Sequence, residues 1–354
     1  MTPGRPASRP RVPVIALTGY LGAGKTTLLN HLLRTPGARL GCVINDFGDI
    51  NVDAALVSGE VDEPASVAGG CLCCMPDAGG LETALERLTA ARTDLDAILI
   101  EASGLAEPPN LVRLLRSAAS RRVRYAGLID VVDAINDART IGGAPPARYG
   151  AATLVVVAKT DLLDAGERRR ALARVAGRAR ARNPRALVVE ADHGRIDPLL
   201  VMDVAQEATP PGELPLAELT RTARTEAHGG HRHAHADCLT VPAALPVSPG
   251  ALADLLERPP ADAYRIKGIL DVAAGPPGAS GGARRMVVNA VAGQVHLETA
   301  RPARPAEPGL VAIGTRLGDD VRAALEEALR PAREPPSPSD LARLDRIRRR
   351  SRGI

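Results

Sequence analysis

The sequence predicts an α/β protein with a mostly parallel sheet, followed by a small α+β domain. Short apolar runs alternate with helical patterns across the first 206 residues, as is typical of a parallel sheet with helices on both faces. A glycine-rich stretch lies between the first apolar run and the first helical pattern, which indicates a loop between a strand and a helix. The order of elements changes after residue 237, which indicates a second domain.

The individual elements follow from apolar runs of strand length and from the helical spacing of apolar residues. In the first domain we expect strands at 12–18, 40–45, 95–101, 124–130, 152–158 and 186–190. We expect its helices at 25–34, 79–92, 109–119, 164–181 and 196–206. In the second domain we expect strands at 238–241, 264–272, 284–290, 293–299 and 309–314, and helices at 249–257 and 318–330. A further helical pattern occupies 339–350.

These patterns divide the chain into five parts. Proline pairs and a His-Gly run interrupt the alternation between the two domains, which indicates a linker. The parts are a disordered tail at 1–11, the first domain at 12–206, a His-rich linker at 207–237, the second domain at 238–330 and a basic tail at 331–354.

The composition limits what kind of protein this chain can be. Its 354 residues are enough for two domains with their own cores, and these cores are aliphatic because only 1% of the residues are aromatic. The net charge is +4, but the tails at 1–11 and 331–354 carry +3 and +4, which leaves the remainder near −3. A globally basic surface is therefore absent, and we expect no nucleic-acid partner.

Targeting signals and cysteine usage indicate the compartment. No apolar stretch approaches the length of a membrane span, and the first residues lack the apolar region of a secretory signal. The five cysteines are an odd number with three crowded together, which argues against a disulfide framework. We therefore expect a cytoplasmic protein with no membrane partner.

The sequence of residues 19–26, GYLGAGKT, fits the pattern GxxxxGK[ST] of a phosphate-binding P-loop. The backbone N–H groups of such a loop and the N-terminus of the following helix surround a phosphate chain. We expect Lys25 to bind the β- and γ-phosphates and Thr26 to offer its hydroxyl to Mg²⁺. The predicted nucleotide-binding residues of this segment are Gly19, Gly22, Ala23, Gly24, Lys25, Thr26 and Thr27.

Lysine is rare in this chain. Of its 45 lysine and arginine residues, three are lysines: Lys25, Lys159 and Lys267. Because the guanidinium fork is bulkier than an ammonium, arginine would not fit the same phosphate cradle. Lysines retained in an arginine-biased chain therefore indicate positions where the compact charge matters.

The apolar run at 95–100 ends in the stretch EASGLAEP, which begins at Glu101. An acid at the end of a strand beside the P-loop strand can hold Mg²⁺ through water or position the attacking water. Gly104 can present its backbone N–H to a γ-phosphate. We predict Lys25, Glu101 and Gly104 as catalytic residues, and Thr26, Asp46 and Glu101 as the residues at Mg²⁺. The alternative is a surface acid before a proline-terminated loop.

Residues 158–161, AKTD, resemble the guanine-reading Asn-Lys-x-Asp loop of GTPases. Asp161 can accept hydrogen bonds from N1–H and from the amino group of guanine, and adenine offers neither in that arrangement. Lys159 can lie along the base and the ribose, whereas Ala158 removes the side-chain amide that braces this loop. The alternatives are an exposed polar turn, or an ATP-dependent kinase or ATPase in which Asp161 would have no purpose.

Three cysteines form the second unusual cluster, in the stretch GCLCC at 70–74. If the chain is extended here, the Cys-x-Cys spacing puts Cys71 and Cys73 on one face, and Cys74 adds a third thiol close by. Closely spaced thiolates favour Zn²⁺, Cu(I) or other thiophilic ions, and we expect Zn²⁺ or Co²⁺ here. Redox chemistry through a disulfide and small buried thiols are the alternatives. Cys42 and Cys238 stand alone, and we expect them to be core thiols.

Two further stretches carry candidate ligands. The acids of residues 45–51, NDFGDIN, lie where a switch loop could contact both Mg²⁺ and a metal at the cysteines; the alternative is a plain acidic loop. Clustered imidazoles in the linker suit loose capture of Zn²⁺, Co²⁺ or Ni²⁺, and the alternative is a polar linker with incidental histidines. These histidines are His228, His231, His233 and His235. His31, His193 and His296 show no pattern.

Together these motifs resemble the CobW-type P-loop GTPases, also called the CobW/HypB/UreG class of metallochaperone GTPases. The resemblance implies a P-loop GTPase domain at 12–206 and a CobW-like C-terminal domain at 238–330. Two residues depart from the family pattern: Ala158 stands in place of asparagine and Asp46 in place of glutamate. The matching stretches are GYLGAGKTT, NDFGDI, GGCLCC, EASGLAEP, VVDA (131–134), AKTD, NPRA (183–186), the His-rich linker, RIKG (265–268) and VAIG (311–314).

The resemblance implies slow, Mg²⁺-dependent hydrolysis of GTP that gates the transfer of a metal, usually Zn²⁺ or Co²⁺, to a client protein. We therefore expect GTP, Mg²⁺ and one of these metals as ligands, a metal-requiring client as partner, and leave a homodimer open. The rival interpretation is a metal-buffering or adaptor protein that binds nucleotide with little turnover.

Overall fold

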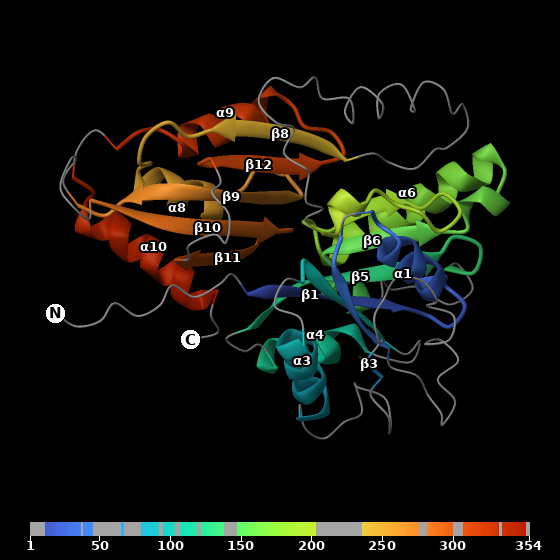
Figure 1. Ribbon diagram of the computed structural model, residues 1–354. Coiled ribbons are helices and arrows are strands. Elements are labelled where there is room, and N and C mark those ends of the chain that lie inside the picture. Colours follow the sequence, from blue (N-terminus) through green and yellow to red (C-terminus); the bar gives the residue numbers. More distant parts are fainter. Residues whose placement is uncertain are drawn as a thin grey trace.

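A computed structural model gives the fold of the chain, which consists of a larger α/β unit and a smaller sheet domain (Figure 1). In the described part of the chain, no helix is long and apolar enough to cross a membrane. The structure describes residues 11–36, 38–44, 65–66, 79–91, 95–102, 107–118, 122–137, 147–202, 236–275, 282–299, 307–332 and 335–351.

The first unit is built on a seven-stranded sheet in the order β3-β2-β4-β1-β5-β6-β7, and all of its strand pairs are parallel. Parallel strands are covered on both faces, so their residues are apolar in continuous runs, as in the five buried residues of β6. The strands are β1 (Val12–Gly19), β2 (Leu40–Ile44), β3 (Ala65–Ser66), β4 (Ala97–Glu101), β5 (Val123–Asp133), β6 (Leu154–Ala158) and β7 (Leu187–Glu190).

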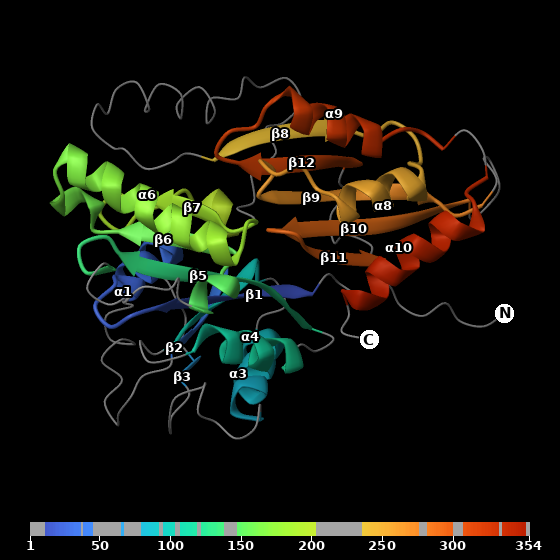
Figure 2. The ribbon, with the colours of Figure 1, turned by 180° about the vertical axis from the view of Figure 1, so that it is seen from behind.

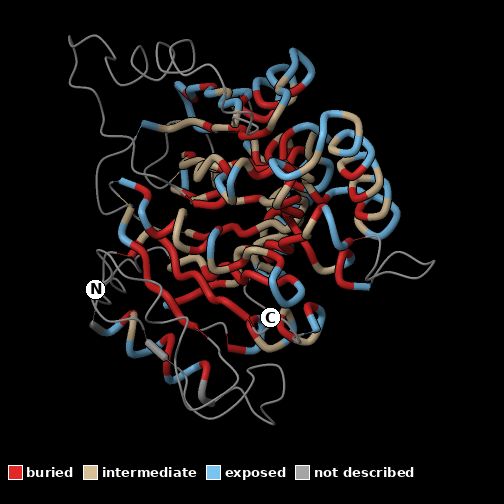
Figure 3. Tube along the Cα trace, turned by 90° about the vertical axis from the view of Figure 1, so that its right-hand side faces the viewer, coloured by how far each residue is buried: buried red, intermediate tan, exposed pale blue. Residues whose placement is uncertain are grey.

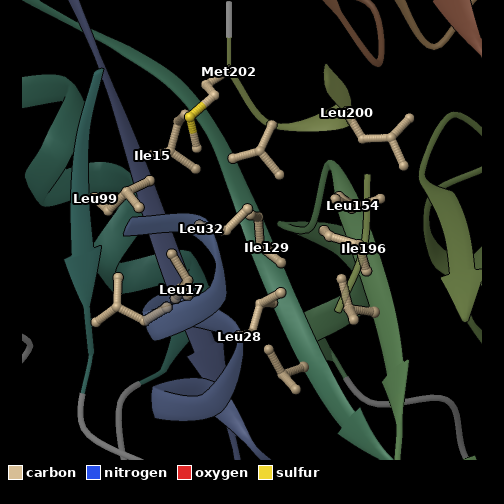
Figure 4. Close-up of a cluster of buried hydrophobic side chains, with 14 of the residues drawn as sticks. Ile15, Leu17, Leu28, Leu32, Leu99, Ile129, Leu154, Ile196, Leu200 and Met202 are labelled. Carbon is tan, nitrogen blue, oxygen red and sulfur yellow. The ribbon is translucent and has the colours of Figure 1, made fainter. Parts of the chain in front are cut away.

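Helices cover both faces of this sheet. Helix α1 (Lys25–Leu33) lies on one face, where its leucines share a buried cluster with alternate residues of the central strands. Figure 4 shows this cluster, with Leu28 and Leu32 of α1 facing Leu17, Ile129 and Leu154. The opposite face carries α3 (Gly79–Ala91), α4 (Pro108–Ser117) and α6 (Ala165–Arg182), which share a second buried cluster.

The second domain is a five-stranded antiparallel sheet in the order β11-β10-β9-β12-β8. Its helices lie together on one face, in front of the sheet in Figure 2. Leu252, Val321 and Leu344 from the three helices join the same buried cluster. The elements are β8 (Asp237–Pro242), α8 (Pro249–Glu257), β9 (Arg265–Ala273), β10 (Ala283–Val291), β11 (Gln294–Thr299), β12 (Gly309–Gly314), α9 (Asp319–Ala328) and α10 (Pro338–Arg350).

The two units share a buried interface. Tyr264 and Ile313 of the second domain belong to the same apolar cluster as Ile15 and Leu200 of the first. Figure 3 shows buried residues concentrated along the strands of both sheets, with the exposed residues mainly on the outer faces of the helices. At one margin of the interface, Arg11 donates a hydrogen bond to Glu298.

The predicted fold class is confirmed, including the parallel first sheet and the α+β character of the second domain. The α-helix predicted at 196–206 is wrong over the described part, which holds a 3-10 turn at Pro198–Leu200. The reason is packing: Ile196, Leu200 and Met202 are all buried in the same cluster, and this spacing does not fit one face of an α-helix. The two-residue strand β3 was not predicted.

Candidate nucleotide-binding site

The P-loop connects β1 to α1 at the carboxyl edge of the first sheet. Gly19 has φ 153°, and a Cβ there would lie 2.5 Å from the carbonyl oxygen of Val131. Gly24 is the N-cap of α1 with φ 102°, a conformation that L side chains rarely adopt. The glycines therefore let the backbone turn tightly against β5 before the helix begins.

Lys25 is held against the loop in this structure. Its Nζ donates to the carbonyl oxygens of Gly19 at 3.2 Å and of Tyr20 at 3.4 Å. The residue is only 8% exposed, so its ammonium lies inside the curve of the loop. The compact charge of Lys25 therefore lies against the backbone carbonyls of the glycine-rich loop.

Thr26 and Glu101 lie together. The Thr26 hydroxyl donates to Glu101 Oε1 at 3.0 Å, although the residues come from α1 and from the end of β4. They meet because β4 pairs with β1 in parallel, which places Glu101 opposite Leu17 at the same edge of the sheet. An uncharged hydroxyl and a buried carboxylate form an all-oxygen donor set, the kind that Mg²⁺ prefers.

A buried ion pair supports the P-loop from the side. Asp130 on β5 is fully buried and accepts hydrogen bonds from Thr18 at 2.9 Å and from Arg148 Nη2 at 2.6 Å. The guanidinium of Arg148 also lies 4.1 Å from the centroid of the Tyr20 ring. Since the Tyr20 carbonyl accepts a hydrogen bond from Lys25, the Asp130–Arg148 pair is connected to Lys25 through Tyr20. No sequence pattern indicated Asp130 or Arg148.

The AKTD loop lies directly beside the P-loop. Lys159 has φ 62°, and its Nζ donates to Asp133 Oδ2 at 2.7 Å. Although burial alone would raise it, hydrogen bonds from Lys159 and Asn136 hold the pKa of Asp133 below its ordinary value. A Cβ at Gly24 would lie 3.7 Å from the Cβ of Ala158, so position 158 borders the phosphate-binding loop.

Asp161 has a neighbour that the sequence did not indicate. Nδ1 of His193, from the loop after β7, lies 3.3 Å from Asp161 Oδ2. The two residues come from separate loops and approach because β6 and β7 are adjacent parallel strands. A histidine three residues beyond a strand end carries no periodic signal, which is why sequence reasoning missed it.

Several predicted ligands lie outside the described residues. These are Gly104, Asp46, the three clustered cysteines and the four linker histidines, so their roles stay predictions. Within the described ranges, no group of three or more His, Cys, Asp or Glu side chains could hold a metal ion.

The two isolated cysteines differ from each other. Cys42 is buried on β2, as expected, and burial together with the charge of Glu101 raises the pKa of its thiol to about 12. Cys238 on the edge strand β8 is exposed, so the expectation of a core thiol is wrong there. Because side chains alternate along a strand, Cys238 faces away from the helix-covered side on which its neighbour Leu239 packs.

Family models match both units of the chain. The CobW/HypB/UreG nucleotide-binding domain matches residues 13–190, and the cobalamin synthesis protein cobW C-terminal domain matches residues 237–333. The chain belongs to the CobW family. The first match contains the P-loop, Glu101 and the AKTD loop, and the second contains the antiparallel sheet.

Relatives in this family carry related names. The zinc chaperone CobW of Sinorhizobium sp is 30% identical over 331 residues, covering 83% of this chain and 89% of that protein. The zinc chaperone YjiA of Escherichia coli (strain K12) is 33% identical over 196 residues, covering 52% of this chain and 59% of that protein. The zinc-regulated GTPase metalloprotein activator 1 of Schizosaccharomyces pombe is 32% identical, covering 52% of this chain and 47% of that protein.

Solved structures are similar at lower identity. The Zn(II)-bound YjiA GTPase from E. coli is 23% identical with a TM-score of 0.41, over 91% of this chain and 99% of that chain. HypB from Helicobacter pylori in complex with nickel is 19% identical with a TM-score of 0.41, over 53% of this chain and 81% of that chain.

Proposed function

We propose that this chain is a GTP-hydrolysing metallochaperone that delivers Zn²⁺ or Co²⁺ to a client protein, with the nucleotide state gating a metal site at Cys71, Cys73 and Cys74. The observation that carries the proposal is the approach of Thr26 and Glu101 to 3.0 Å beside Lys25. This is the arrangement needed to bind a phosphate chain together with its divalent cation.

Each residue of this group has a role in the proposal. Lys25 exchanges two carbonyl contacts for oxygens of the β- and γ-phosphates. Thr26 and Glu101 would hold Mg²⁺, which when bound neutralises charge developing on the phosphates. Glu101 is 4% exposed, so its carboxylate is already desolvated and fixed in position.

The sheet topology supports a connection between the nucleotide and the cysteines. The chain leaves β2 at Ile44, and Ile44 pairs with Glu101 of β4 and with Ser66 of β3. The stretch that contains Asp46 therefore starts beside the Thr26–Glu101 pair, and the first clustered cysteine, Cys71, follows Ser66 by five residues. Ordering of the first stretch around bound GTP would reach the second through these adjacent strand ends.

The choice of GTP rests on Asp161. In the described part of the chain the AKTD loop borders the P-loop, and Asp161 carries a carboxylate that matches the N1–H and amino group of guanine. The names of the relatives, which include zinc chaperones and a zinc-regulated GTPase metalloprotein activator, agree with this choice.

Multiple-turnover hydrolysis of GTP, with ATP as competitor, tests the proposal. Lys25→Ala should reduce kcat/KM at least about 100-fold, since it removes a charge that acts on the transferred phosphoryl group. Lys267→Ala is the matched control, because it removes a lysine from β9 of the second domain. Full activity of Lys25→Ala, or equal competition by ATP, would contradict the proposed GTPase.

A metal-buffering or adaptor protein is the second candidate, and Ala158 is the observation that favours it. Loss of the asparagine amide beside the P-loop weakens the hold on the base. This candidate predicts binding of nucleotide and metal with little multiple-turnover hydrolysis, whether or not metal is present.

A further inference from the structure

His193 and Asp161 form a pair at the predicted base-binding position. The His193 ring is 66% exposed, and its Nδ1 lies 3.3 Å from Asp161 Oδ2. Its Nε2 lies 3.8 Å from Asp192 Oδ1, beyond hydrogen-bond distance. The ring therefore stands in solvent next to the carboxylate, with one nitrogen directed at Asp161.

The loop that carries His193 is fixed to the P-loop helix. Gly194 has φ 75° and packs so closely on α1 that a Cβ would lie 2.5 Å from Thr27 Cγ2. Thr160 Oγ1 donates to the carbonyl oxygen of Ala191 at 3.3 Å, which ties the same loop to the AKTD loop. His193 itself has φ 48°, an uncommon conformation for a non-glycine residue. These contacts hold the ring beside Asp161.

Position 158 carries no polar side chain. Ala158 places a methyl group next to Gly24, where the guanine loop of other GTPases has a side-chain amide. Asp161 can only accept hydrogen bonds, so it reads N1–H and the amino group but not the O6 acceptor of guanine. A donor for O6 must come from another residue.

We propose that His193 is a second base-reading residue, whose ring N–H donates to O6 of guanine while Asp161 accepts from N1–H and the amino group. O6 and N1 are neighbouring positions on the edge of guanine, so a donor beside the carboxylate faces O6. Adenine presents an amino group at that position, which would oppose the His193 donor. The inference rests on the proposed binding of GTP and names a side-chain donor beside a base-reading loop that has no amide at position 158.

Two variants separate the ring from the backbone conformation. His193→Gly removes the ring and tolerates φ 48°, and His193→Asn keeps a side-chain donor and also tolerates positive φ. Their dissociation constants are measured by calorimetry for GTP, inosine triphosphate and 2-aminopurine riboside triphosphate. Inosine keeps O6 and N1–H and lacks the amino group, whereas 2-aminopurine keeps the amino group and lacks both O6 and N1–H. Comparing each variant with the wild type for the same nucleotide removes the effect of N1–H, which concerns Asp161, and leaves the effect of the His193 ring.

The proposal predicts that His193→Gly weakens GTP and inosine triphosphate by about threefold to tenfold, the range of one hydrogen bond. The same change should alter binding of the 2-aminopurine nucleotide by less than about twofold, and His193→Asn should recover most of the loss. An equal loss for all three nucleotides would show a merely structural role and overturn the proposal, as would unchanged affinity for GTP. If the wild type binds ATP as tightly as GTP, the assignment of guanine to Asp161 fails as well.

Discussion

Glu298 connects the two domains through a cluster of buried charges. Removing its charge should lower the stability of the protein by an amount that depends on pH. It is 7% exposed on β11 and accepts hydrogen bonds from Arg11, directly before β1, and from His296, whose Nε2 lies 2.9 Å away. Arg11 also donates to the carbonyl oxygen of Ser351 at the end of α10, at 3.4 Å. The change Glu298→Gln removes the charge and keeps the shape of the side chain.

The magnitude follows from the pKa of Glu298. Burial would raise it, but the hydrogen bond from His296 and the charge of Arg11 lower it from 4.5 to about 2. Since one pH unit corresponds to about 1.4 kcal/mol, the charged form contributes up to about 3 kcal/mol to stability at neutral pH. A lowered pKa means that this contribution is present above pH 4.5 and is lost as the pH falls toward 2. Burial also lowers the pKa of His296, so protonation of its imidazole adds a loss below pH 6.5 in the same direction.

Unfolding by urea, followed by circular dichroism at pH 7 and pH 3.5, measures the effect. Glu298→Gln should cost about 3 kcal/mol at pH 7, and the penalty should shrink by about 1 kcal/mol at pH 3.5, where Glu298 of the unfolded wild type is largely protonated. Glu326→Gln, on the exposed surface of α9, is the matched control and should change stability by less than about 0.5 kcal/mol at either pH. A penalty for Glu298→Gln that is equal at both pH values would refute the electrostatic reasoning.

Two further predictions concern the buried ion pair beside the P-loop and the two isolated cysteines, Cys42 and Cys238. Arg148→Met leaves the carboxylate of Asp130 buried without its main partner and should destabilise the protein by about 3 kcal/mol or more; adding Asp130→Asn should restore part of the loss in urea unfolding, and an additive double variant would contradict the coupling. Because Cys238 is exposed and the thiol of Cys42 is buried with a pKa of about 12, a thiol reagent should label Cys238 in the native protein and Cys42 only after unfolding; mass spectrometry of the labelled peptides checks this, and early labelling of Cys42 would count against its burial.

The sheet and most of the first domain could be predicted because their signals are local. The P-loop is a continuous stretch of sequence, and the backbone conformation of the loop requires glycine at particular positions. At Gly19, for example, a Cβ would clash with the carbonyl oxygen of Val131. The strand ending at Glu101 was recognisable as an apolar run closed by an acid, and parallel pairing with β1 then brings Glu101 to Thr26.

The pairs that cross the fold could not be predicted from local patterns. Asp130 and Arg148 are separated by 18 positions, and His193 is 32 positions from Asp161, so neither pair has a fixed spacing to recognise. The turn at Pro198–Leu200 was mistaken for part of a helix because its apolar residues serve the interface between the domains rather than one helix face. In each case the second domain or a neighbouring loop decides the outcome.

The proposed coupling between the nucleotide and the metal site can be tested by measuring the binding of Zn²⁺ and Co²⁺ to the metal-free protein by competition with a chromophoric chelator. The metal affinity is measured in three conditions: in the presence of a GTP analogue plus Mg²⁺, of GDP, or of ATP. The same measurements are made on a variant in which Cys71, Cys73 and Cys74 are all replaced by serine. The GTP analogue alone should raise the affinity for the metal, and the serine variant should lose tight stoichiometric binding. A metal affinity that is the same with every nucleotide would contradict the proposed coupling between the nucleotide and the metal site. Unchanged affinity in the serine variant would show that the three cysteines are not the metal ligands.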